Sequence, residues 1–125
     1  MKLDDSTRRA LGHRWNCQLV TRGRSSGQPR RVTIWFAVDG DEIVLAGGPE
    51  GPHWYRNLRR CADVELSVGR LRLRGRARAV EDEEAAKQIR QCFVQRYLAV
   101  RLSRLFGGYT RSVVARVAID QVDES

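Results

Sequence analysis

The stretch RVTIWFAVDGDEIVLAG, residues 31–47, predicts a β-hairpin and therefore a sheet with antiparallel strands. Residues 31–38 are almost continuously β-branched or aromatic, which favours an extended strand. The Asp39-Gly40 pair that follows is typical of a tight hairpin turn, because glycine adopts the positive φ that such turns require. Residues 41–47 then supply the returning strand.

Four more strands are expected around this hairpin. Residues 62–69 and 70–80 alternate apolar with polar side chains, which is the pattern of a strand with one buried face. Runs of β-forming residues predict the other two strands at 15–21 and 112–122.

Three helices are expected between these strands. A short helix over residues 7–12 follows capping residues, and a second begins at His53 or Trp54 and reaches about Arg60. A longer one begins near Glu81 and ends at Gly107-Gly108. Six strands with one long helix before the last strand predict a mainly β, α+β fold, a six-stranded antiparallel barrel forming one domain over residues 1–125.

The chain is strongly basic, with 23 lysines and arginines against 15 acids and a net charge of +8. Such a balance indicates an anionic partner, which could be nucleic acid, acidic lipid or a phosphorylated or carboxylated small molecule. Arginines alternate along the strand at 70–80 and should share one face. They form either a phosphate track for nucleic acid or a solvated face paired with acids such as Glu65, and the absence of interleaved aromatics favours pairing.

Two classes of protein are disfavoured by what the sequence lacks. The three cysteines and two histidines have no metal-ligand spacing, so no metal site is expected. No apolar run approaches the roughly 18 residues that a membrane helix needs. We therefore expect no integral membrane segment and a cytoplasmic location.

Two loops have the chemistry of an anion site. In residues 20–31, glycines allow close approach of the backbone while serines and arginines offer hydrogen-bond donors and charge. Residues 46–54 place a glycine-rich loop before a helix N-terminus, whose free N–H groups attract anions. The alternatives are an exposed hairpin tip for the first loop and a connection anchored by a core Trp54 for the second.

Taken together, residues 19–80 resemble the deazaflavin-dependent nitroreductase family, within the split-barrel oxidoreductases related to the pyridoxamine-phosphate-oxidase fold. The turn TRGRSSGQPR, the Asp-Gly hairpin, the small-residue loop AGG and the segment WYRNL occur here in the family's order, over about half of the chain. The resemblance implies a split β-barrel of FMN-binding-like fold, often a homodimer, that binds coenzyme F-420. This cofactor carries a phosphodiester and a glutamate tail, which fits the cationic excess.

The resemblance also implies which residues hold the cofactor. The basic turn would bind the phosphate and tail, and the small-residue loop with Thr33 would line the deazaflavin. The start of the second helix would complete the pocket, with Tyr109 a weak candidate for a proton donor. The expected cofactor-binding residues are Arg24, Ser25, Ser26, Arg30, Arg31, Thr33, Ala46, Gly47, Gly48, His53, Trp54 and Asn57.

The resemblance implies an oxidoreductase that passes a hydride from reduced F-420 to a quinone, a nitro compound or an activated double bond. Many members of the family carry a cation where this chain has Ser25, or a lysine where it has Gly47-Gly48. An FMN-binding enzyme or a non-catalytic cofactor carrier is therefore the first alternative, and a basic nucleic-acid-binding barrel is the second. The expected partner is a small-molecule electron acceptor and not nucleic acid.

Overall fold

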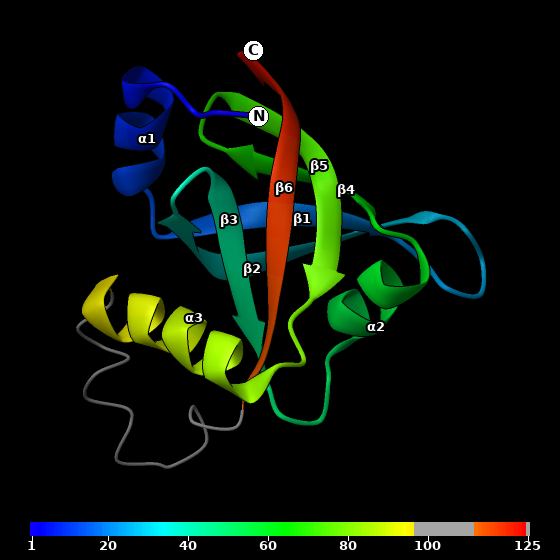
Figure 1. The fold of residues 1–125 in the computed structure, drawn as a ribbon. Helices are drawn as coiled ribbons and strands as arrows, with labels where there is room; N and C mark the ends of the chain where they lie inside the picture. The colour runs from blue at the N-terminus through cyan, green and yellow to red at the C-terminus, as the bar shows by residue number, and fades with distance from the viewer. Residues whose placement is uncertain (97–111, 125) are drawn as a thin grey trace.

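The six expected strands form one closed antiparallel barrel. In the computed structural model, which describes residues 1–96 and 112–124, the strands follow the order β1-β2-β3-β6-β5-β4 around the barrel, and β4 pairs again with β1 (Figure 1). The mainly β fold with helices is therefore confirmed. The elements are α1 (Asp5–Gly12), β1 (Asn16–Arg22), β2 (Pro29–Asp39), β3 (Glu42–Gly47), α2 (His53–Arg60), β4 (Asp63–Val68), β5 (Leu71–Ala79), α3 (Glu83–Arg96) and β6 (Val113–Glu124).

The predicted hairpin is present and is longer than the sequence pattern indicated. Asp39 pairs with Glu42, so the turn consists of two residues, and Gly40 adopts a φ of 64° there. β2 begins at Pro29, two residues before the expected Arg31, because the ladder with β1 continues outward as far as the Arg22–Pro29 pair. The polar residues at this end are held in the sheet by backbone pairing.

The helices agree with the pattern where the structure describes them. Asp4 is the N-cap of α1, and its side chain accepts a hydrogen bond from the backbone N–H of Thr7. α2 has the expected bounds, and α3 begins two residues after the expected Glu81. The rest of that predicted helix, its Gly107-Gly108 end and Tyr109 lie outside the described residues. Within the described part of the chain, no helix is long and apolar enough to cross a membrane.

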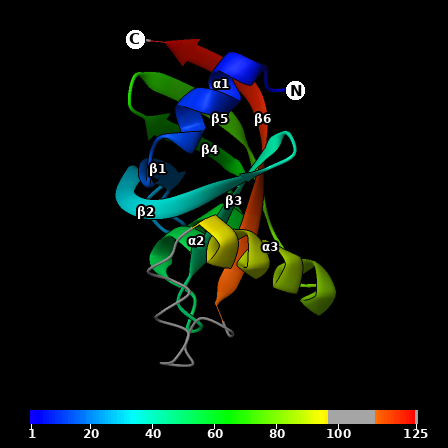
Figure 2. The same cartoon turned by 90° about the vertical axis from the view of Figure 1, so that its left-hand side faces the viewer.

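Two apolar clusters stabilise the barrel, one on each side of the sheet. The interior is filled by residues such as Leu19, Phe36 and Leu45, all fully buried. On the outside, α3 packs Ile89 and Phe93 against residues of β2, β3 and β6 that point away from the interior (Figure 2). The sheet is therefore apolar on both faces only where α3 covers it.

The arginines of β5 lie on the outer face, as the alternation predicted. The side chains of Arg74 and Arg76 form ion pairs of 3.0 Å with Glu65 and 3.4 Å with Asp63. Arg78 pairs with Glu42 at 3.0 Å. Acids on β4 and β3 thus compensate three arginines of the stripe, which supports the pairing interpretation over a phosphate track.

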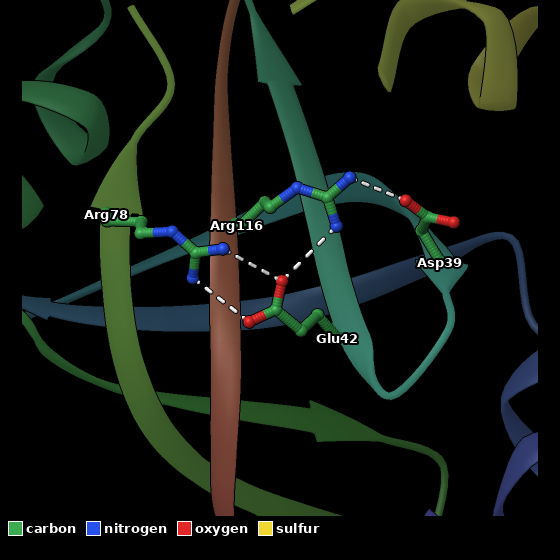
Figure 3. Close-up of polar contacts among 4 residues, drawn as sticks. All are labelled: Asp39, Glu42, Arg78 and Arg116. Atoms are coloured by element: carbon green, nitrogen blue, oxygen red, sulfur yellow. Dashed lines mark hydrogen bonds and ion pairs between the residues drawn. The ribbon is translucent and has the colours of Figure 1, made fainter. Parts of the chain in front are cut away.

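One of these pairs belongs to a half-buried cluster that connects four strands (Figure 3). Glu42 of β3 accepts hydrogen bonds from Arg78 of β5 and from Arg116 of β6, and Arg116 also donates to Asp39 of β2 at 2.6 Å. The hydrogen bonds from Arg78 are the main cause that lowers the pKa of Glu42 below its ordinary 4.5. The cluster connects the turn end of the β2–β3 hairpin to β6 and β5.

The lowered pKa of Glu42 gives an expected pH dependence of stability. A carboxyl whose pKa is depressed by folding stabilises the fold above its ordinary pKa of 4.5, and this contribution is lost as the pH falls through the depressed value. We expect Glu42→Gln to lower the free energy of unfolding at neutral pH. Urea unfolding at steps between about pH 7 and pH 3 should show the difference from wild type shrinking.

The exposed substitution Glu84→Gln on α3 is the control for loss of a negative charge elsewhere. A difference between Glu42→Gln and wild type that stays constant over the whole pH range would contradict the assignment.

Candidate functional site

A cavity of about 580 Å³ lies between the β1–β2 loop, the first residues of β2 and the start of α2. In Figure 1 this loop projects on the same side of the barrel as α2. The cavity joins the basic turn to the helix start, which are about 30 residues apart in the sequence. It is lined by Thr21, Gly23, Arg24, Ser25, Ser26, Arg30, Arg31, Val32, Pro52, His53, Trp54 and Asn57.

The β1–β2 loop is closed by backbone hydrogen bonds that its glycines make possible. The N–H of Gly23 donates to the carbonyl of Gln28, and the N–H of Gly27 donates to the carbonyl of Gly23, both at 2.8 Å. Gly27 has a φ of 70°, which strongly favours glycine. A Cβ on Gly23 would lie 2.8 Å from the Oγ of Ser26. The compact turn holds its serine and arginine side chains at the mouth of the cavity.

The N-terminal end of α2 forms the opposite wall. Pro52 precedes the helix, and no side chain caps the first turn, so N–H groups there are available to a ligand. The indole of Trp54 is only 6% exposed and contributes apolar surface. Behind it lies Gly47 of β3, where an added Cβ would come within 2.8 Å of both Trp54 and Pro52.

A chain of polar contacts joins the loop to α2. The Nη1 of Arg24 donates to the Oδ1 of Asn57 at 2.9 Å, and its Nη2 lies 3.2 Å from the Nδ1 of His53. Because a guanidinium only donates, this geometry assigns the Nδ1 of His53 as acceptor and its ring proton to Nε2. The side-chain amide of Asn57 also donates to the Oγ1 of Thr21 at 3.2 Å.

The buried thiol of Cys17 lacks the features of a reactive centre. Burial raises the pKa of the Cys17 thiol to about 12, so this group stays protonated and is a poor nucleophile. Among the described residues, no group of three or more histidines, cysteines and acids is arranged to hold a metal ion. The cavity's own lining combines cationic and hydrogen-bonding groups with apolar ones.

Comparison with known proteins places the chain in a family. Residues 3–104 match the family model described as F-420H(2)-dependent quinone reductase. The chain belongs to this family. The resemblance found in the sequence, to deazaflavin-dependent enzymes with a split barrel, is thereby confirmed.

Individual relatives support the same placement. A segment of 70 residues is 36% identical to an F-420H(2)-dependent quinone reductase of Mycobacterium tuberculosis, and it covers 53% of this chain and 47% of that protein. The match therefore spans about half the length of this relative. Solved structures extend the likeness to the whole fold.

Two solved structures illustrate the shared fold. One is a conserved hypothetical protein of Mycobacterium tuberculosis, with a TM-score of 0.77 at 20% identity over 98% of this chain and 83% of the other. The other is described as an F-420 reductase, with a TM-score of 0.66 at 19% identity over 98% of this chain and 100% of the other. At these identities the structures show the split-barrel fold alone.

The cavity brings together most of the residues that the family resemblance implied. Arg24, Ser25, Ser26, Arg30 and Arg31 line it on one side, and His53, Trp54 and Asn57 on the other. Their roles as cofactor ligands stay predictions.

Thr33 and the small-residue loop occupy other positions. Thr33 is exposed on β2 and does not line the cavity, whereas Arg30, Arg31 and Val32 at the start of the same strand do. Ala46, Gly47 and Gly48 also lie outside the lining, although Gly47 supports it from behind.

Sequence reasoning missed four lining residues, Thr21, Gly23, Val32 and Pro52. The alternation along β1 and β2 carried a signal for Thr21 and Val32, since both face the same side as buried neighbours. No comparable periodicity marks the two loop residues.

A matched pair of glycine substitutions tests the support behind the cavity. Gly47→Ala should lower the free energy of unfolding by about 1–3 kcal/mol, because its Cβ would meet the packed Trp54 and Pro52. Gly48→Ala should change it by less than about 0.5 kcal/mol, since the added Cβ meets only the flexible carboxylate of Glu50. Urea unfolding of both variants measures the difference, and equal losses would contradict this packing.

Proposed function

We propose that this protein transfers a hydride from reduced F-420 to a small organic acceptor, foremost a quinone. The observation that carries the proposal is the cavity, which brings Arg24, Arg30 and Arg31 together with the apolar side chains of Val32 and Trp54. This combination matches a cofactor with an anionic tail and a flat ring system. Membership of the quinone reductase family supports both the cofactor and the acceptor class.

The size and surroundings of the cavity fit such a cofactor. Its volume of about 580 Å³ is in the usual range for sites that enclose a small ligand. A second hollow continues from Arg24 and Ser25 over the face of α2, where it is lined by Arg56, Arg59 and Arg60. Arg59 pairs with Glu81 at 2.9 Å, and the other arginines around this hollow offer charge next to the uncharged Ser25. A long anionic ligand such as F-420 would use both hollows, whereas FMN needs only the first.

The residues of the chain would bind and orient the cofactor and keep water from its rings. When bound, reduced F-420 supplies the hydride from C5 of its deazaflavin. The arginines and loop N–H groups hold the anionic end, and the buried Trp54 and half-buried Val32 shape the apolar side where the rings would lie. Holding donor and acceptor in a dry, fixed geometry accounts for catalysis without a covalent intermediate on the protein.

Side-by-side titration of the purified protein with F-420 and FMN tests the choice of cofactor. We expect saturable binding of F-420, followed by oxidation of reduced F-420 when a quinone is added. Binding of FMN with no binding of F-420 would replace this proposal with an FMN enzyme or carrier. Binding of F-420 without turnover of a quinone or of nitro compounds would indicate a carrier.

Two arginine substitutions test the place of the anionic end. Arg24→Ala and Arg30→Ala should each weaken F-420 binding roughly tenfold or more, since each removes charge-assisted hydrogen bonds to the ligand. The control Arg76→Ala also removes one positive charge, but from the outer wall of the barrel, where Arg76 pairs with Asp63. Fluorescence titration of F-420 measures the three affinities, and equal effects of all three variants would leave only a general charge effect.

We further propose that the protein is a homodimer in the cytoplasm. Trp15 is 58% exposed and Trp35 is 40% exposed, and both lie near the Asn16–Trp35 pair of β1 and β2. Exposed aromatic side chains that gather on one surface are typical of interfaces. The free cysteines suit a reducing compartment.

The dimer makes its own prediction. Sedimentation equilibrium should give twice the chain mass of 14.3 kDa. The double substitution Trp15→Ser and Trp35→Ser should shift the protein toward the monomer, and a wild-type monomer at high concentration would contradict the dimer.

A nucleic-acid-binding role has weaker support than these proposals. Three arginines of the β5 stripe are engaged by acids of β4 and β3, so their charge is compensated locally. The clustered arginines lie instead around the cavity and α2, where a small anionic ligand fits.

A further inference from the structure

We propose that Asn57 acts on the ligand through Arg24, as a positioning residue that fixes the basic loop, and not by touching the ligand itself. This inference rests on the proposed function for the identity of the ligand. The contact between Asn57 and Arg24 stands on the geometry alone, and the experiments below separate the two.

The side chain of Asn57 is buried and occupied by the protein. Asn57 is 3% exposed and lies on the buried side of α2 with Trp54 and Leu58. Its Oδ1 accepts from the backbone N–H of Arg24 at 3.3 Å and from the Nη1 of Arg24 at 2.9 Å. An amide oxygen has two lone pairs, and these two bonds use both.

The donor side of the same amide is directed into the barrel wall. Nδ2 donates to the Oγ1 of Thr21, which is 1% exposed at the end of β1. Asn57 therefore joins three elements: α2, the β1 strand and the loop that follows it. A buried polar group held on both sides in this way favours one arrangement of its neighbours over others.

This arrangement fixes the direction of the Arg24 guanidinium. Nη1 is held by Asn57 and Nη2 lies against His53, so the side chain is immobilised at two points. Arg24 lines both the cavity and the hollow over α2, and its remaining N–H groups are available there. Without Asn57 a flexible arginine would have to be ordered by the ligand, which lowers affinity.

Only a short side chain with both an acceptor and a donor meets these requirements. Aspartate would keep the acceptor but would neutralise Arg24, and leucine would leave the Arg24 N–H and the Thr21 hydroxyl without this partner. The contacts with Arg24 and Thr21 thus explain why position 57 is an asparagine.

Hydrogen exchange of the free protein tests the contact without any ligand. The backbone N–H of Arg24 should exchange slowly in the wild type, because its acceptor is a buried side chain. In Asn57→Ala the exchange rate should rise by roughly tenfold or more. Arg60→Ala, an exposed change on the same helix, should leave the rate unchanged. An unchanged rate in Asn57→Ala would overturn the proposal.

A double-mutant cycle with oxidised F-420 as the probe then tests how Asn57 affects binding. Arg24→Ala and Asn57→Ala should each weaken F-420 binding, by roughly tenfold in the case of Arg24. The double variant should bind no more than about twofold more weakly than Arg24→Ala, since the guanidinium that Asn57 orients is absent from both variants. Additive losses would show that Asn57 affects the ligand by a route other than the Arg24 side chain and would overturn the proposal, as would unimpaired binding by Asn57→Ala.

Asn57→Ser takes the place of the alanine variant if that protein fails to fold. Serine keeps a small polar side chain at this position and is too short to reach Arg24, so the expected results are the same in both experiments. If the wild type binds no F-420, the proposed function fails, whereas the exchange experiment still decides whether Asn57 holds Arg24.

Discussion

The unequal pairing of β1 with its two neighbours is the constraint on which the site depends. β1 pairs with β2 along its whole length, from Asn16 to Arg22, but with β4 only from Gln18 to Val20. Beyond Val20, β1 has no pairing with β4, and the element that precedes β4 in the chain is α2. Because α2 ends at Arg60, shortly before β4 begins at Asp63, the helix lies beside the end of β1 that is not paired with β4. The cavity is the space between this helix and the β1–β2 loop.

The arginines of the protein fall into two groups, one on the outer wall of the barrel and one around the cavity. On the outer wall, arginines of β5 and β6 alternate with acids of other strands and form ion pairs, including the half-buried cluster around Glu42. These arginines stabilise the sheet locally. Around the cavity the arginines face a loop and a helix, and the described side-chain contacts of Arg24 are with Asn57 and His53, neither of which is an acid. The arginines of the proposed site therefore lie at the β1–β2 loop and α2, apart from those of the outer wall.

Much of the fold could be predicted because its signals are local. The β-branched run before Asp39-Gly40 and the alternation along β4 and β5 each depend on residues that are neighbours in the sequence. The prediction was less accurate where backbone pairing overrides composition. β2 extends through Arg30 and Pro29 because β1 runs opposite them, although neither residue favours a strand. Thr33 was assigned to the pocket with its neighbours, but the lining of the cavity ends at Val32 on this strand.

The sequence by itself determined the hairpin, the periodic strands, the basic turn and the helix start, because glycine conformations and side-chain periodicity act over a few residues. Only the tertiary structure decided that the turn and the helix form one cavity. Arg24 and Asn57 are 33 positions apart, and their hydrogen bond exists because barrel closure brings α2 against the end of β1. The burial of Asn57 against Thr21 has the same origin. No local pattern encodes a distance between segments that meet only when the sheet closes.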